Sequence, residues 1–160
     1  MVESTNKALS KLTIKEELSQ ELQQVRDAII ATLPKNAEPI FIGVAGSRAK
    51  HMNSPGSDYD CKVVVKYPRN QYMLGDIKST RDFKTEVNGV EVEGSTIDIL
   101  TQIKYAADTN AMAYDTWSSI PLLETETSQV IKQFYLEAYH PRAIQDHAVG
   151  MLAGYRSRHL

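Results

Sequence analysis

Hydrophobic positions near the start of the chain predict one amphipathic helix. Four apolar residues recur at steps of 4, 3 and 4, which places them on one helix face: Leu18, Leu22, Val25 and Ile29. Thr13 and Glu16 precede this stripe at the spacing of a capping box, so the helix is expected to begin there. It is expected to run to Leu33, because the segment 34–36 starts with proline.

Short apolar runs then predict strands. Residues 39–45 form one buried strand and residues 58–67 a second, which has three consecutive valines at its centre and ends before Pro68. Segment 69–81 fits either a short helix or a loop. Residues 83–93 predict a hairpin, because Asn88-Gly89 suits a type I′ turn.

Gly94-Ser95 predicts a break after the hairpin, and residues 96–100 predict a further strand. From residue 101 onward the pattern becomes helical, with helices expected over 102–109, 111–119, 127–138 and 141–158. One helix, four or five strands and then helices indicate an α/β (α+β) fold, a mixed sheet flanked by helices. We expect a flexible N-terminus (1–11), a core (12–100) and a short helical C-terminal part of the same domain (101–160).

Composition narrows the functional classes. The chain has 160 residues, the length of one domain, and a net charge of −2, so a nucleic-acid partner would need a local basic patch. The single cysteine, Cys61, can form neither an intramolecular disulfide nor a cysteine-based zinc site. A polar N-terminus and the lack of any run of 18 apolar residues predict a cytoplasmic protein without a membrane segment.

Two carboxylates on the second predicted strand indicate a metal site. Asp58 and Asp60 stand at i and i+2, so both point to one face of the strand. They repel each other unless a cation lies between them. Oxygen ligands suit Mg²⁺, or Mn²⁺, which binds through one or two carboxylates plus substrate phosphates.

Asp98 supplies a third carboxylate, between Ile97 and Ile99 on the predicted strand 96–100. If the two isoleucines pack into the core, Asp98 faces the other way, toward Asp58 and Asp60 where the strands are neighbours. Three carboxylates can hold two metal ions, which would activate an attacking hydroxyl and stabilise a leaving pyrophosphate.

Gly46-Ser47 predicts the partner of these metals. It ends an apolar strand and opens a short helix, where free N–H groups and the Ser47 hydroxyl suit a phosphate. Arg48 and Lys50 are nearby cations that could reach phosphate oxygens.

These motifs resemble a known superfamily. Gly46-Ser47-Arg48-Ala49, followed by 53–60 with Ser57-Asp58-Tyr59-Asp60, is similar to the signature of DNA polymerase β superfamily nucleotidyltransferases. The nearest branch is the RlaP-like family linked to RNA repair, in which a later acidic strand leads into a lysine-bearing helix, as Asp98 and Lys104 do here. The resemblance covers about residues 40–120.

The resemblance implies metal-dependent transfer of a nucleoside monophosphate from a nucleoside triphosphate to a hydroxyl acceptor. It also implies that Asp58 and Asp60 bind the metals, that Asp98 helps to activate the acceptor, and that Gly46 and Ser47 hold triphosphate oxygens. The chain departs from the branch where Lys50-His51 replaces a frequent glycine, and where Ala111 and Asp115 replace a usual proline and glutamate.

Two other functions stay open. The chain could be a non-catalytic interaction protein, antitoxin-like or phage-encoded, that keeps the nucleotidyltransferase fold. An RNA-end binding role is suggested by the RlaP-like resemblance and by the basic C-terminus with Arg156 and Arg158. The sequence leaves open the nucleotide, the oligomeric state and the acceptor, which could be an RNA end, a small molecule or a protein.

Overall fold

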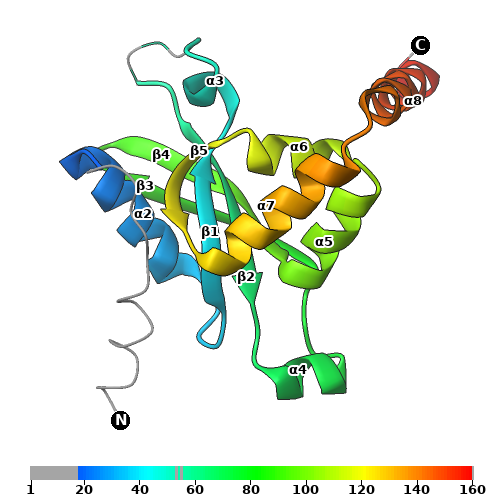
Figure 1. Cartoon of the computed structure of the whole chain (residues 1–160). Coiled ribbons are helices and arrows are strands. Elements are labelled where there is room, and N and C mark those ends of the chain that lie inside the picture. Colours follow the sequence, from blue (N-terminus) through cyan, green and yellow to red (C-terminus); the bar gives the residue numbers. More distant parts are fainter. Residues whose placement is uncertain (1–17, 53, 55, 160) are drawn as a thin grey trace.

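Five strands form one mixed sheet in the order β3-β4-β2-β1-β5 (Figure 1). The computed structural model describes residues 18–52, 54 and 56–159. The strands are β1 (Glu38–Val44), β2 (Tyr59–Lys66), β3 (Thr80–Val87), β4 (Val90–Asp98) and β5 (Ile120–Glu124). Among the described strands, β2 and β4 pair in parallel, and the other neighbours are antiparallel. The predicted fold class, a mixed sheet flanked by helices, is confirmed.

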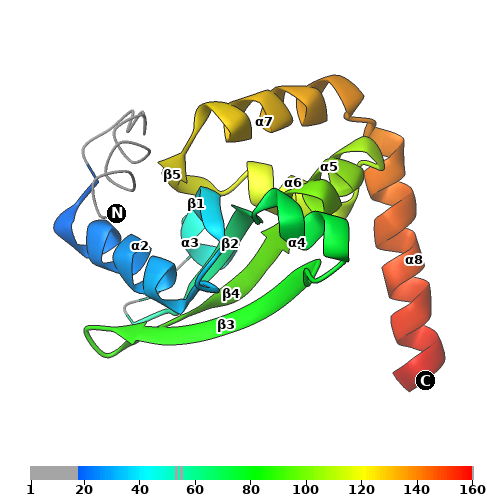
Figure 2. The same ribbon diagram turned by 90° about the horizontal axis from the view of Figure 1, so that it is seen from below.

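Helices cover both faces of this sheet (Figure 2). They are α2 (Gln20–Thr32), α3 (Gly46–Ala49), α4 (Arg69–Leu74), α5 (Ile99–Ala107), α6 (Ala111–Trp117), α7 (Glu126–Ala138) and α8 (Pro141–His159). Helix α2 packs on one face, and α5, α6 and α7 pack on the other. Helix α8 extends away from this body.

Strand alternation divides the core between the two faces. On the α2 side, Val25 and Ile29 of the helix pack with the odd-numbered residues of β2, Tyr59 to Val65. On the opposite side, Phe41 and Val64 pack with α5, α6 and α7, and the Phe41 ring lies 5.1 Å from that of Trp117. The predicted apolar stripe of α2 therefore forms part of the core, while the even-numbered face of β2 is buried only around Val64.

Helix α2 begins later than predicted. It starts at Gln20, because the Ser19 side chain accepts a hydrogen bond from the Leu22 N–H and so caps the first turn. Thr13 and Glu16, like the predicted flexible segment 1–11, lie outside the described residues.

The predicted break at Gly94-Ser95 is wrong, since β4 runs without interruption from Val90 to Asp98. A Cβ added at Gly94 would lie 1.9 Å from the carbonyl oxygen of Cys61, so glycine here permits close approach of β4 to β2 rather than ending a strand. The Asn88-Gly89 hairpin turn is confirmed, with positive φ at both residues.

The sequence predicts only helices after residue 101, but the C-terminal part also contains a strand. Strand β5 lies between α6 and α7 and pairs with β1 at one edge of the sheet. Its Pro121 is tolerated because an edge strand has a free side that needs no N–H donor.

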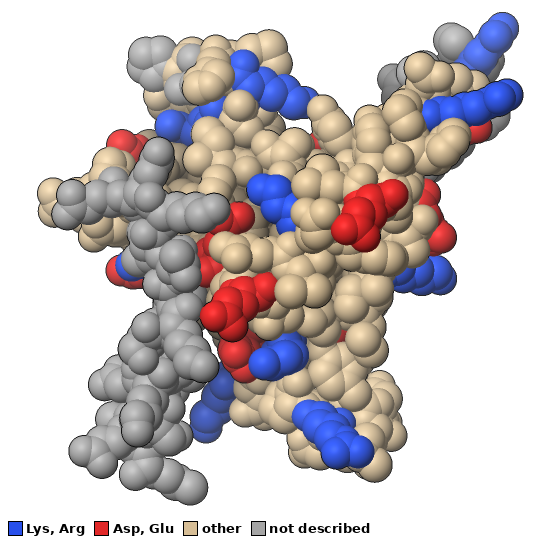
Figure 3. All heavy atoms as spheres, in the orientation of Figure 1, with Lys and Arg blue, Asp and Glu red and all other residues tan. Residues whose placement is uncertain are grey.

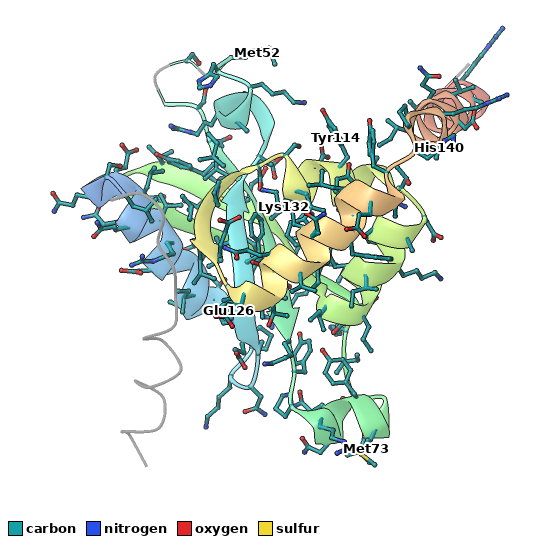
Figure 4. All side chains as sticks on the ribbon, in the orientation of Figure 1. Met52, Met73, Tyr114, Glu126, Lys132 and His140 are labelled. Atoms are coloured by element: carbon teal, nitrogen blue, oxygen red, sulfur yellow. The ribbon has the colours of Figure 1, made fainter. Side chains whose placement is uncertain are left out.

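The two ends of the β2–β4 pair lie at opposite ends of the molecule. Figure 4 shows Met52, in the loop after α3, at one end and Met73, on α4, at the other. Both side chains are exposed. The first end carries Gly46 and Asp60, and the second carries Asp98.

Candidate active site

Gly46 and Asp60 are in direct contact where β1 gives way to α3. Gly46 has a φ of +62°, which glycine adopts without strain, and a Cβ placed there would lie 3.2 Å from Asp60 Oδ2. The Ala45 N–H donates to the Asp60 carbonyl at 2.7 Å. The structure thus brings the predicted phosphate turn and the second predicted carboxylate together.

The carboxylate beside Asp60 on the next strand is Glu93. In the parallel register Asp60 pairs with Glu93, and Glu93 pairs in turn with Lys84 of β3. Register partners share a face of the sheet, so these three side chains form a row across β2, β4 and β3. Sequence reasoning missed Glu93 because the assumed break at Gly94 hid the length of β4.

A second row lies beside the first on the same face. Lys62 follows Asp60 by two residues and pairs with Ser95, which pairs with Asp82 of β3. The Lys62 ammonium lies 3.3 Å from Asp60 Oδ1. The two rows together form an open patch on the sheet in which carboxylates outnumber ammonium groups.

Asp58 lies at the edge of this patch. It directly precedes β2 and is exposed. A hydrogen bond to Glu91 raises the pKa of Lys84, and the charges of Glu93 and Asp58 contribute in the same direction. The charges of Asp58 and Glu93 therefore both act on the Lys84 ammonium group.

All members of the two rows except Lys84 line a cleft of about 450 Å³, which Met112 of α6 also lines. Ser95 is only 9% exposed, and its hydroxyl is buried and has no hydrogen-bond partner among the described residues. A buried hydroxyl without a partner is costly unless a ligand or water satisfies it. The cleft therefore contains an open polar position next to Asp60 and Lys62.

Arg48 was predicted to bind phosphate, but the structure gives it another set of contacts. Its Nε lies 3.1 Å from the Ser57 carbonyl and 3.2 Å from the Asp58 carbonyl, and Cζ lies 3.7 Å from the centre of the Tyr59 ring. Burial, and the hydrogen bond that Tyr59 donates to Glu21, raise the pKa of Tyr59 to about 12. Arg48 thus stabilises the segment that directly precedes β2.

Ser47 and Lys50 remain available for a ligand. Both are exposed: Ser47 lies in α3, and Lys50 follows its last residue. Figure 3 shows basic side chains over the α3 segment at the top of the molecule. The first residues of a helix have N–H groups without intrahelical partners, so the turn at Gly46 offers donors beside Asp60.

Asp98 is not part of this site, and its predicted placement is wrong. It pairs with Val65, whereas Glu93 pairs with Asp60, so it lies about 16 Å farther along the strand at roughly 3.3 Å per residue. It is 2% exposed and caps α5, accepting from the Leu100 and Thr101 N–H groups. The Tyr72 hydroxyl donates to it at 2.6 Å.

The carboxylates around Asp60 could supply part of the coordination shell of a magnesium ion, and a substrate would have to supply the rest. Among the residues described, no group of three His, Cys, Asp or Glu side chains is arranged to hold a metal ion. Mg²⁺ commonly needs only one or two carboxylates, and phosphates and water complete its shell. Asp60, with Glu93 beside it and Asp58 nearby, meets that smaller requirement, and Asp60 already attracts a cationic group, Lys62.

No helix in the described part of the chain is both long enough and apolar enough to cross a membrane. No known protein-family model matches the sequence, and no curated protein is significantly similar to it.

Proposed function

We propose that this chain is a metal-dependent nucleotidyltransferase, which transfers a nucleoside monophosphate from a nucleoside triphosphate to a hydroxyl acceptor. The observation that carries the proposal is the contact between the Gly46 turn and Asp60. The turn suits a phosphate and the carboxylate suits Mg²⁺, so a ligand that contains phosphate with a bound Mg²⁺ ion would contact both. A nucleoside triphosphate with its metal is such a ligand.

Glu93 takes the place that Asp98 had in the sequence-based hypothesis. Asp58 and Asp60 remain the predicted metal-binding pair, and Glu93 is the acidic residue on the neighbouring strand. A metal bound there would supply positive charge to the phosphate oxygens and to the attacking oxygen. The family resemblance stays an expectation, which the mixed sheet and the order of the motifs support.

In the proposed reaction, Ser47 and the adjoining N–H groups hold the triphosphate oxygens while the acceptor oxygen attacks the α-phosphorus. The bond from the α-phosphorus to the bridging oxygen breaks, and pyrophosphate leaves with the electron pair. Glu93 accepts the proton of the acceptor hydroxyl.

Asp60→Asn tests this proposal. We expect it to lower label transfer from α-labelled nucleoside triphosphates by more than about a hundredfold, because a neutral amide lacks the negative charge that a carboxylate brings to a metal. Transfer is measured with Mg²⁺ or Mn²⁺ and with RNA, pooled small molecules and the protein itself as acceptors. Asp76→Asn, an exposed aspartate beyond α4, is the matched control and should keep full transfer. Full activity in Asp60→Asn would exclude the proposed site.

A second candidate is a non-catalytic interaction protein with the same fold. The ion pair between Lys62 and Asp60 favours it, because a lysine already occupies the contact that a metal would need. Titration with nucleotide and Mg²⁺ separates the two functions. An enzyme binds nucleotide more tightly when the metal is present, whereas an interaction protein binds neither.

A further inference from the structure

Lys62 is an unusual lysine because most of its side chain is buried. The side chain is 13% exposed, while that of its partner Asp60 is 47% exposed. Lysine side chains normally keep their ammonium group in water. The groups that face Lys62 across the sheet are Ser95 and Asp82, and Glu93 lies beside its partner.

Lys66 provides an internal comparison. It lies on the same strand and the same face, and its ammonium lies 3.1 Å from Glu38 Oε2. That side chain is 43% exposed, and its carboxylate partner belongs to no candidate site. What distinguishes Lys62 is therefore the combination of burial with a partner that the proposed function assigns to a metal.

An ammonium group and a divalent cation cannot both sit against one carboxylate without strong repulsion. If Asp60 binds a metal, Lys62 has to give up its contact with Asp60. A mostly buried ammonium then needs another oxygen, since an unpaired buried charge is costly. The unpartnered Ser95 hydroxyl is one such oxygen, but it is neutral and only partly compensates the charge.

We propose that Lys62 is a resident cation of the Asp60 site, which yields Asp60 to the metal and then binds a phosphate oxygen of the nucleotide. This inference rests on the proposed function and adds a coupling to it. Without nucleotide, Lys62 competes with the metal. With nucleotide, Lys62 gains a phosphate partner, so metal and nucleotide bind cooperatively.

Two titrations of Lys62→Met test the coupling. The first uses Mn²⁺ alone, followed by electron paramagnetic resonance, and the second uses a preformed complex of Mn²⁺ with α,β-methylene ATP, followed by calorimetry. Relative to wild type, the variant should bind Mn²⁺ alone at least about fivefold more tightly and the complex at least about fivefold more weakly, a typical size for linked binding sites. These opposite signs are the signature of Lys62 exchange.

Controls separate this effect from damage to the fold. Lys66→Met should leave both affinities unchanged, and Lys62→Arg, which keeps the charge, should remain near wild type in both titrations. Thermal unfolding of each variant reports whether the fold is retained. Changes of the same sign in both titrations of Lys62→Met, or no change for Mn²⁺ alone, would overturn the inference.

The wild-type titrations report separately on the proposed function. Tight binding of the complex by wild type supports that function whatever the variant does. If Lys62→Met binds Mn²⁺ alone while wild type binds neither Mn²⁺ nor the complex, the proposed function is contradicted, and the exchange of Lys62 onto a phosphate is overturned with it. A failure of both proteins to bind either probe excludes the proposed function and the inference together.

Discussion

The two ends of the β2–β4 pair hold carboxylates in opposite environments. At one end Asp60 is half-exposed beside Glu93, and within the described residues its one side-chain partner is the ammonium group of Lys62. At the other end Asp98 is 2% exposed and accepts three hydrogen bonds, from Tyr72, Leu100 and Thr101. Both residues interrupt apolar strand sequence and look equivalent in the chain.

The burial and the number of hydrogen-bond donors around each carboxylate indicate whether it stabilises the fold or can bind a ligand. A buried carboxylate with several donors stabilises the structure around it, here by capping α5 and fastening Tyr72. A half-exposed carboxylate beside another carboxylate, with few donors, is free to take a ligand. We therefore expect changes at the Asp60 end to affect transfer, and changes at the Asp98 end to affect stability.

The largest expected contrast is between Glu93→Gln and Asp98→Asn. We expect Glu93→Gln to lower nucleotidyl transfer by more than about a hundredfold, because the amide neither accepts the acceptor proton nor carries charge for the metal. Asp98→Asn should lower transfer by less than about threefold, since asparagine is also a good helix cap. Initial rates of label transfer measure both. Equal losses in the two variants would remove the distinction between the ends.

The second contrast concerns stability. Asp98→Ala should lower the free energy of unfolding by about 3 kcal/mol, because it removes the α5 cap and leaves the Tyr72 hydroxyl without its acceptor. Asp60→Ala should lower it less, by about 1–2 kcal/mol, because it removes a single partner, that of the mostly buried Lys62 ammonium. Urea unfolding followed by circular dichroism measures both. A larger loss in Asp60→Ala would show that Asp60 is structural too.

The smallest effect sharpens the Asp98 end through pH. Burial, followed by the hydrogen bond to Asp98, raises the pKa of Tyr72 to about 12. A folded-state pKa above the unfolded value of about 10 means that this stabilisation is complete below pH 10 and is lost between pH 10 and 12. At pH 8 the free energy of unfolding of wild type should exceed that of Tyr72→Phe by about 1 kcal/mol, after discounting for solvent screening.

Unfolding of both proteins in urea at pH 8, 9, 10 and 11 measures that difference. The advantage of wild type should shrink as the pH rises above 10. A constant difference across this range would show that the Tyr72 hydroxyl is not held by Asp98 in its neutral form.

The part of the site that lies close together in the chain could be predicted from sequence. The fold class followed from the order of the elements, and the closeness of Gly46 and Asp60 from the end of an apolar strand, while the metal-binding roles of Asp58 and Asp60 stay predictions. These features depend on neighbouring residues alone, and the structure places Gly46 against Asp60.

What failed depended on pairing between distant strands. The role given to Asp98 needed a register that the sequence does not specify, and the register places Glu93 beside Asp60 instead. The alternation Val90-Glu91-Val92-Glu93 carried the signal of a half-buried strand, but Gly94 was interpreted as its end. Arg48 could not be assigned because its acceptors are backbone carbonyls, which every residue has.

Gly94 has a consequence for finding related chains. Because any side chain there would strike the Cys61 carbonyl, the position tolerates no replacement while β4 stays against β2. Loss of that contact would also move Glu93 away from Asp60, since they are adjacent register partners. An acidic residue followed directly by glycine, some thirty residues after an Asp-x-Asp strand, is therefore a more informative signature for a sequence search than the Ile-Asp-Ile segment beyond it.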